Sequence, residues 1–208
     1  MNPVVMPFDE LLELLLQHPS QQHISRLANR IAGDADLIAG MIQVGRSSHA
    51  GRAENHAAWV MRKLFDAKPL MLTPFRDELF CWVLETDSES VRRNLLPLFS
   101  AYLSQEFVTQ SELVGKLYVK CFGWADSEHY TIAVRCNAMQ FLADLAAIEP
   151  ELWHELLPLF EKIHQHAKGG VWARSRQLLN QMRKSDQTYG RKNQTGQGSP
   201  EKYRKYGN

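Results

Sequence analysis

The spacing of apolar residues is the feature that most constrains the fold: they recur every three or four positions along most of the chain. Runs in which β-branched residues alternate with polar ones are missing. A spacing of three and four places apolar side chains on one face of an α-helix, whereas a strand needs a spacing of two. The sequence therefore predicts an all-α protein.

Proline, glycine and capping residues divide this pattern into helices with short connections. Pro19 with Ser20 ends one helix and starts the next, and Thr73 with Pro74 supplies a cap followed by a first-turn proline. Residues 45–51 are predicted to form a loop. Asp87 and Ser88 are predicted to cap the helix that follows them. The predicted helices cover residues 7–16, 20–31, 34–44, 53–65, 74–84, 90–103, 109–122, 127–147, 149–166 and 171–182.

Four segments of the chain align without gaps. They begin at His56, Arg92, Arg135 and Arg174, which are 36, 43 and 39 positions apart. A period of about 40 residues is typical of stacked units of two helices. The sequence therefore predicts a helical repeat domain of about five helix pairs over residues 1–184.

The string DSESVRRNLLPLF and, more loosely, YTIAVRCNAMQFL resemble the HEAT repeat, whose second helix begins with an acid followed by Val-Arg and apolar residues. Together with HAAWVM and EPELWHEL, they are also similar to short bacterial HEAT-like proteins of unknown role. Some of those proteins carry the name of adenylosuccinate lyase, but this chain lacks the Gly-Ser-Ser loop of such lyases. The resemblance implies a right-handed α-α superhelix (HEAT/ARM-like solenoid) that acts as a scaffold.

The second helices of HEAT-like arrays line the concave face, so the resemblance implies that their polar and aromatic residues bind a protein partner. Arg and Trp often dominate the binding energy of interfaces. An alternative is a structural role for the repeated arginine, which would pair with an acid of a neighbouring repeat such as Asp87, Glu89 or Glu128. The partner-binding candidates are Trp59, Arg62, Arg92, Arg93, Asn94, Arg135, Asn137, Trp172 and Arg174, with Arg176 beside them.

Motifs of enzymes and metal sites are weak in this sequence. It contains no Gly-x-Ser-x-Gly turn, no His-Glu-x-x-His pair and no glycine-rich phosphate loop that follows a strand. The pairs Glu151/His154 and Glu161/His164 fall on one predicted helix, about 15 Å apart, so they cannot share one metal ion. We expect a non-catalytic protein without a metal or cofactor.

The charge of the chain is unevenly distributed. Residues 183–208 carry a formal charge of +5, whereas the preceding residues carry −4. The composition of residues 185–208 predicts a disordered basic tail. Its tyrosines and basic residues are suited to nucleic acid, although a solvated extension without function explains them as well. The alternative function is nucleic-acid binding, related to the HEAT-like alkylpurine DNA glycosylases, which the acidic body disfavours.

Cysteine usage and hydropathy predict the cellular compartment. Cys81, Cys121 and Cys136 show no paired spacing, which suits a reducing compartment. No segment reaches the ~18 consecutive apolar residues of a membrane span. We therefore expect a cytoplasmic protein without membrane contact, while the identity of the protein partner and the oligomeric state stay open.

Overall fold

The computed structural model describes residues 8–17, 20–47 and 51–194, and it describes side chains as far as residue 183. Over these residues the chain forms eleven α-helices and two short 3₁₀ segments, without a strand. The prediction of an all-α protein is therefore confirmed. Contacts group the chain into two compact units, unit 1 (residues 1–150) and unit 2 (residues 151–208).

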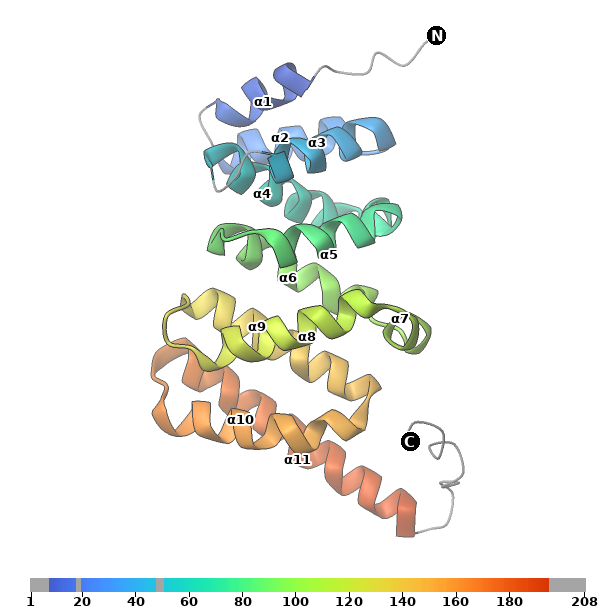
Figure 1. The fold of residues 1–208 in the computed structure, drawn as a ribbon, viewed down its shortest axis with the longest axis vertical. Helices are drawn as coiled ribbons and strands as arrows, with labels where there is room; N and C mark the ends of the chain where they lie inside the picture. Colours follow the sequence, from blue (N-terminus) through green and yellow to red (C-terminus); the bar gives the residue numbers. More distant parts are fainter. Residues whose placement is uncertain (1–7, 18–19, 48–50, 195–208) are drawn as a thin grey trace. The chain divides into compact units, whose positions relative to one another are not determined.

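Unit 1 consists of α1 (Phe8–Leu16), α2 (Gln21–Ile31), α3 (Ala35–Ser47), α4 (Arg52–Ala67), η1 (Pro69–Phe75, 3₁₀), α5 (Arg76–Glu85), α6 (Glu89–Tyr102), α7 (Gln105–Gln110), α8 (Glu112–Asp126) and α9 (Ile132–Ile148). Its helices stack as successive pairs (Figure 1). The first helices α3, α5 and α8 pair with the second helices α4, α6 and α9. The second helices pack on one another in chain order, which is a helical-repeat arrangement.

Unit 2 contains a helical hairpin. A 3₁₀ turn at η2 (Pro150–Leu152) leads into α10 (Trp153–His166), which packs against α11 (Gly169–Gln194). Gly169 between these helices has φ = 60°, a left-handed conformation that favours glycine. Helix α11 continues ten residues past the predicted end of the repeat domain at residue 184. Of the tail predicted to be disordered over residues 185–208, residues 185–194 belong to α11, and residues 195–208 lie outside the described residues.

Side-chain caps explain where several helices begin. The Oγ of Ser20 accepts a hydrogen bond from the backbone N–H of His23 at 3.1 Å, and the Oγ of Ser88 accepts one from Val91 at 3.3 Å. These bonds satisfy N–H groups that have no partner within the helix. The helix starts predicted at Ser20 and near Ser88 are confirmed.

Two predicted boundaries in the first half of unit 1 are wrong. The loop predicted over residues 45–51 begins late, because α3 continues to Ser47 with Gly45 buried inside it. Thr73 does not cap a helix with its side chain, since it lies within η1 and its carbonyl accepts a hydrogen bond from the N–H of Arg76.

Two predicted boundaries around α8 are also wrong. The short helix α7 was not predicted; it begins because the Oγ of Ser104 accepts a hydrogen bond from the N–H of Phe107. Helix α8 continues to Asp126, so Ser127 ends α8 rather than starting α9. Trp124, Ala125 and Asp126 therefore all lie in the last turn of α8.

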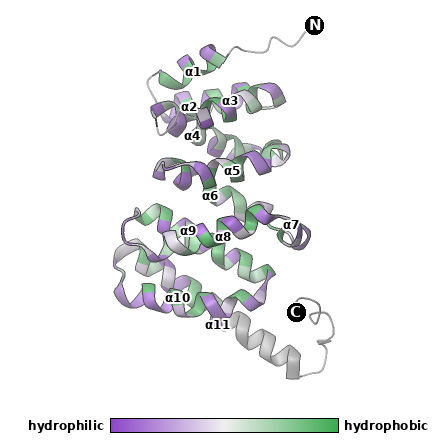
Figure 2. Ribbon diagram, viewed as in Figure 1, coloured by the Kyte–Doolittle hydropathy of each residue, from purple (hydrophilic) through white to green (hydrophobic). Residues whose placement is uncertain are grey.

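An aromatic cluster joins α5, α6 and α7 in the core of unit 1. The ring of Phe80 lies 4.1 Å from that of Phe99 and 5.6 Å from that of Phe107, between centroids. Burying each such side chain contributes about 1.5–3 kcal/mol. Figure 2 shows hydrophilic and hydrophobic residues interleaved along the helices. Accordingly, no helix in the described part of the chain is both long enough and apolar enough to cross a membrane.

The burial pattern shows which positions of the second helices correspond. Six buried positions of α6 recur 43 residues later in α9 and 38 residues earlier in α4. Glu54 therefore occupies the position of Arg92 and Arg135, so the sequence alignment on His56 is shifted by two residues. The six positions are Ala53, Glu54, Ala57, Ala58, Val60 and Met61 in α4; Val91, Arg92, Leu95, Leu96, Leu98 and Phe99 in α6; and Val134, Arg135, Ala138, Met139, Phe141 and Leu142 in α9.

Candidate functional site

Arg92 is buried and makes its contacts inside the fold. Its side chain lies on α6, and Nη2 donates a hydrogen bond to the carbonyl of Thr86 at 2.5 Å. The guanidinium lies over the ring of Trp124, 4.8 Å from the centroid. Asp87, the acid expected to pair with it, lies 3.8 Å away and is fully exposed, so this ion pair contributes little. The backbone carbonyl and the indole are the main partners of Arg92.

Arg135 has a similar role in the next repeat. It is buried, and its Nε donates a hydrogen bond to the carbonyl of Ala125 at 3.2 Å. Ala125 lies in the last turn of α8, and Thr86 caps the end of α5. Carbonyls at the end of a helix lack partners within that helix. Each arginine therefore caps the first helix of its own pair, which favours the structural interpretation at these two positions.

Glu54, at the corresponding position of α4, is also buried and reaches α5. Its Oε1 accepts a hydrogen bond from the Nε1 of Trp82 at 3.3 Å and another from the hydroxyl of Thr86 at 2.5 Å. The contact of Arg92 with Trp124 in α8 is equivalent, since each tryptophan lies near the end of the following first helix. This position therefore links successive helix pairs inside the core.

The remaining candidates of unit 1 lie at the surface of its second helices. Arg93 is exposed, and its Nη2 donates a weak hydrogen bond to the Oγ of Ser90 at 3.3 Å. Trp59 is half-buried, and Arg62 forms an ion pair of 2.8 Å with Asp66. We call this region the second-helix surface and define it by Trp59, Arg62, Arg93, Asn94 and Asn137.

Two asparagines bind backbone carbonyls of this surface. The Nδ2 of Asn137 on α9 donates a hydrogen bond to the carbonyl of Arg93 on α6 at 3.0 Å, so it bridges two repeats. Asn94 instead donates to the carbonyl of Ser90 in its own helix at 2.9 Å. The two asparagines therefore bind different carbonyls, and both hold the backbone around Arg93.

Glu89 adds another link between α6 and α9. Its Oε2 accepts a hydrogen bond of 2.8 Å from the backbone N–H of Thr131, the N-cap residue of α9. Hydrogen bonds from the hydroxyl and then the N–H of Thr131 lower the pKa of the Glu89 carboxyl below its ordinary value. Glu89 therefore stabilises the junction in its charged form.

The candidates Trp172 and Arg174 belong to unit 2 and form a separate set. The ring of Trp172 is 38% exposed and stacks on the imidazole of His164, with centroids 5.3 Å apart. Arg174 is half-buried, and its Nη1 lies 3.4 Å from the Oε1 of Gln177.

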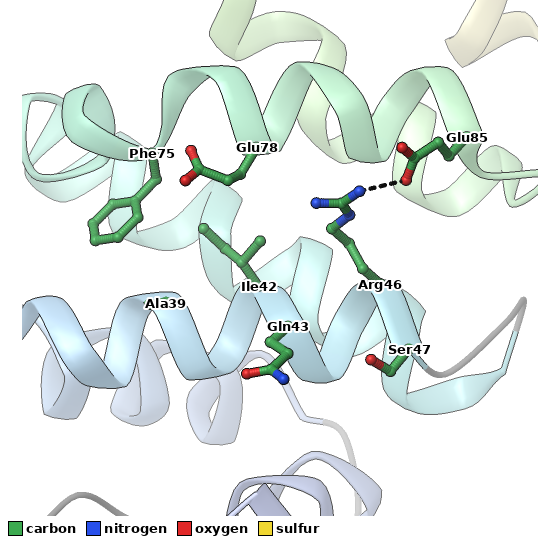
Figure 3. A pocket seen from close by; sticks show the side chains of 8 residues that line it. All are labelled: Ala39, Ile42, Gln43, Arg46, Ser47, Phe75, Glu78 and Glu85. Carbon is green, nitrogen blue, oxygen red and sulfur yellow. Dashed lines mark hydrogen bonds and ion pairs between the residues drawn. The ribbon is translucent and has the colours of Figure 1, made fainter.

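A groove between α3 and α5 was not among the sequence predictions. It encloses about 520 Å³. Figure 3 shows Ile42 and Phe75 facing its interior and an ion pair of 2.6 Å between Arg46 and Glu85 at one end. Glu78 lies beside the groove and is exposed, with no partner among the described residues. No local sequence signal reveals this groove, because it forms between helices some 30 residues apart in the chain.

The cysteines, glutamates and Trp124 of the described residues do not form a catalytic, metal-binding or base-binding site. All three cysteines are free, and burial raises the pKa of the Cys121 thiol well above its ordinary value, which makes it unreactive. Glu161 lies 3.9 Å from the Nη2 of Arg183. Among the described residues, no group of three His, Cys, Asp or Glu side chains is placed to hold a metal ion. The indole of Trp124 is buried, so it is not available to contact a nucleobase.

The stacked helix pairs and the recurring buried position define a helical-repeat protein. The chain matches the HEAT repeat domain family over residues 11–182 and belongs to that family. No curated protein and no solved structure matches the chain. Proteins of the HEAT repeat family are commonly interaction scaffolds and are typically not enzymes.

Proposed function

We propose that this chain is a non-catalytic scaffold that binds a protein partner through its second-helix surface, the face that is concave in HEAT-like arrays. The observation that carries the proposal is that the guanidinium of Arg93 is exposed and forms no ion pair with a described residue. The neighbouring Arg92, in contrast, is buried and makes its contacts inside the core. Exposed arginines without an ion-pair partner are among the residues that most often anchor interfaces.

The surface around Arg93 is held in place before a partner binds. Asn137 fixes the carbonyl of Arg93, and Glu89 fixes the start of α9. A rigid surface loses less conformational freedom on binding, which improves affinity. Arg62 is already paired with Asp66, so Arg93 is the main positive charge of the second-helix surface. We therefore expect the partner to bind through a segment that carries a carboxylate.

The groove between α3 and α5 offers the competing protein-binding surface. Its apolar residues Ile42 and Phe75 and the unpaired carboxylate of Glu78 suit a segment that carries a basic residue. The two surfaces therefore predict partners of opposite charge, which makes them distinguishable.

Selection from a displayed peptide library against the full chain tests the proposal. We expect acidic peptides with an apolar residue to be enriched. Arg93→Glu is expected to weaken their binding at least tenfold, which is the loss of about 1.4 kcal/mol at an interface anchor. Arg26→Glu, the same charge change at an exposed residue of α2, is the matched control and should leave binding unchanged.

The groove is tested in the same experiment with Glu78→Lys. Enrichment of basic peptides that lose binding in Glu78→Lys but not in Arg93→Glu would assign the partner to the groove and contradict the proposal. Binding that is insensitive to both substitutions would contradict both assignments. Melting temperatures of the variants, compared with that of the unsubstituted chain, show whether each remains folded.

A further inference from the structure

Unit 2 carries an exposed layer of aromatic and cationic side chains. The Trp172 ring stacks on the His164 imidazole with 22° between the planes, and the guanidinium carbon of Arg176 lies 5.4 Å from the Trp172 ring centroid. Trp172 is 38% exposed, and Arg176 is exposed without a hydrogen bond or ion pair to a described residue. We call these three residues the stacking cluster.

A buried serine holds the stacking cluster in shape. Ser175, which is fully buried, donates a hydrogen bond from Oγ to the carbonyl of Trp172 at 2.8 Å. The same Oγ lies 3.1 Å from the Nδ1 of His164, within hydrogen-bond distance. Ser175 thus fixes the imidazole relative to the helix that carries the indole, so the layer exists before any ligand binds.

Positive charge is concentrated in the segment that carries Trp172 and Arg176, although Arg183 lies 3.9 Å from Glu161 of α10. Residues 167–183 contain Lys168, Arg174, Arg176 and Arg183 and no acidic residue. Residues 167–208 together hold ten basic and two acidic residues, a formal charge of +8, whereas residues 1–166 hold fourteen basic and twenty-one acidic residues, −7. Attraction of a polyanion is therefore concentrated on this end of the chain.

We propose that the stacking cluster binds one base of a single-stranded nucleic acid, with Arg176 and Lys168 contacting the adjacent phosphates. Exposed indole and guanidinium planes are the groups on which unpaired bases stack, and the surrounding cations attract the backbone. A duplex does not expose the faces of its internal bases, and the acidic side chains of a peptide have no flat ring to place on the indole. This site is independent of the second-helix surface, which lies in unit 1 and is proposed for a protein.

Fluorescence anisotropy of a labelled fifteen-nucleotide oligothymidylate against the full chain, at 50 mM salt, tests the proposal. Trp172→Ala is expected to weaken binding about tenfold, as for the loss of one stacked base. Arg176→Gln is expected to weaken binding severalfold. It should also make the slope of log K against log salt concentration less steep by roughly 0.7, the value for one phosphate contact with a single strand. Because Arg176 is exposed, this second variant tests the site without disturbing the fold.

Matched controls are available in unit 1. Phe8→Ala removes an aromatic ring that is 41% exposed, and Arg26→Gln removes an exposed cation; neither substitution should change binding. An abasic oligonucleotide of the same length has the phosphates without the bases. It should bind the unsubstituted chain about tenfold more weakly than oligothymidylate does, and Trp172→Ala should not weaken it further.

Several results would overturn the proposal. They are undetectable binding of oligothymidylate, equal binding of the abasic and complete oligonucleotides, or unchanged binding in both Trp172→Ala and Arg176→Gln. Displacement of the oligonucleotide by polyglutamate at equal charge concentration would show a general polyanion surface and would also overturn it. A Trp172→Ala protein with an unchanged melting temperature and tenfold weaker oligothymidylate binding supports it.

Discussion

Gly45 in α3 lies directly against the indole ring of Trp82 in α5. A Cβ atom on Gly45 would lie 2.4 Å from Cη2 of Trp82, 2.5 Å from Cζ2, and 3.1 Å from the Cβ of Ala57 in α4. The indole is buried, and its Nε1 is bound to Glu54, so the ring has little freedom to move away. The absence of a side chain at Gly45 therefore allows α3 to pack closely against α4 and α5 at this position.

This contact predicts that Gly45→Ala destabilises the protein. Replacing glycine with alanine inside a helix ordinarily stabilises it by up to about 1 kcal/mol. Here the added methyl group overlaps a buried ring, and overpacking of a core costs about 1–3 kcal/mol. We expect a net decrease in the free energy of unfolding, measured by urea denaturation.

The control for this prediction is Gly115→Ala in α8. A Cβ at Gly115 would have no neighbour within 4 Å, so only the helix propensity changes. We expect this variant to be more stable than the unsubstituted chain by about 0.5–1 kcal/mol. Equal stability of the two alanine variants would contradict the close contact between Gly45 and Trp82.

Arg92 and the adjacent Arg93 predict opposite results for the same substitution. Arg92→Ala removes a buried hydrogen bond to the carbonyl of Thr86 and the buried contact of the guanidinium with the ring of Trp124. We expect a loss of about 2–4 kcal/mol, the range for a buried charged hydrogen bond together with lost packing. Arg93→Ala removes an exposed side chain and should change stability by less than about 0.5 kcal/mol.

Chemical denaturation of both variants checks this pair of expectations. Arg92→Lys provides a further test, because lysine keeps the charge but lacks the planar group that lies on the indole. It should recover only part of the stability lost in Arg92→Ala. Full recovery by lysine would show that charge alone, and not the stacked guanidinium, stabilises this junction.

The helical class and the repeats were predictable because their signals are local. Apolar spacing and the Ser88 cap depend on residues that are neighbours along one helix, and the structure has both. The correspondence between α6 and α9 was also predictable, since Val91-Arg92 and Val134-Arg135 are identical pairs. In α4 the buried acid Glu54 occupies the same position, and no similarity of residue type reveals it.

Features that depend on two distant helices were not predictable. Gly45 indicates a break when it is considered alone, but its contact with Trp82 places it inside a helix. Arg92 and Arg93 are adjacent in the sequence, but the apolar spacing of α6 places only Arg92 on the buried face, with Leu95 and Phe99. The partner of Arg92, the indole of Trp124, depends on the position of α8 and was not predictable.

Tyr102 at the end of α6 predicts an unusual response to alkaline pH. Its hydroxyl is buried without a hydrogen-bond partner among the described residues, and burial raises its pKa to about 12. The folded pKa is above the ordinary value of about 10, so Tyr102 ionises more readily in the unfolded chain, and the free energy of unfolding falls as pH rises from about 10 through 12. Tyr102→Phe should remove this part of the alkaline destabilisation.

At neutral pH, Tyr102→Phe should be neutral or stabilising by up to about 1 kcal/mol, because it deletes a buried polar atom that has no partner. Denaturation curves at pH 7 and pH 11 check both statements. A loss of stability at pH 7 would show that the Tyr102 hydroxyl is hydrogen-bonded in solution.

Glu89 predicts the response to acid at the junction between α6 and α9. Hydrogen bonds from Thr131 lower its folded pKa below the unfolded value, so its contribution is present above about pH 4.5 and is lost as pH falls through the folded pKa. Glu89→Gln should therefore destabilise the protein at pH 7, by under about 1 kcal/mol because the carboxylate is largely exposed. The difference from the unsubstituted chain should shrink as pH falls below about 4.5 and through the folded pKa. Denaturation from pH 7 to pH 3 measures it, with Glu13→Gln, at an exposed residue in the middle of α1, as the control that should show no difference at any pH. A Glu89→Gln deficit that does not shrink at all as pH falls below 4.5 would mean that the glutamate stabilises the junction by packing, and not by accepting the hydrogen bonds of Thr131.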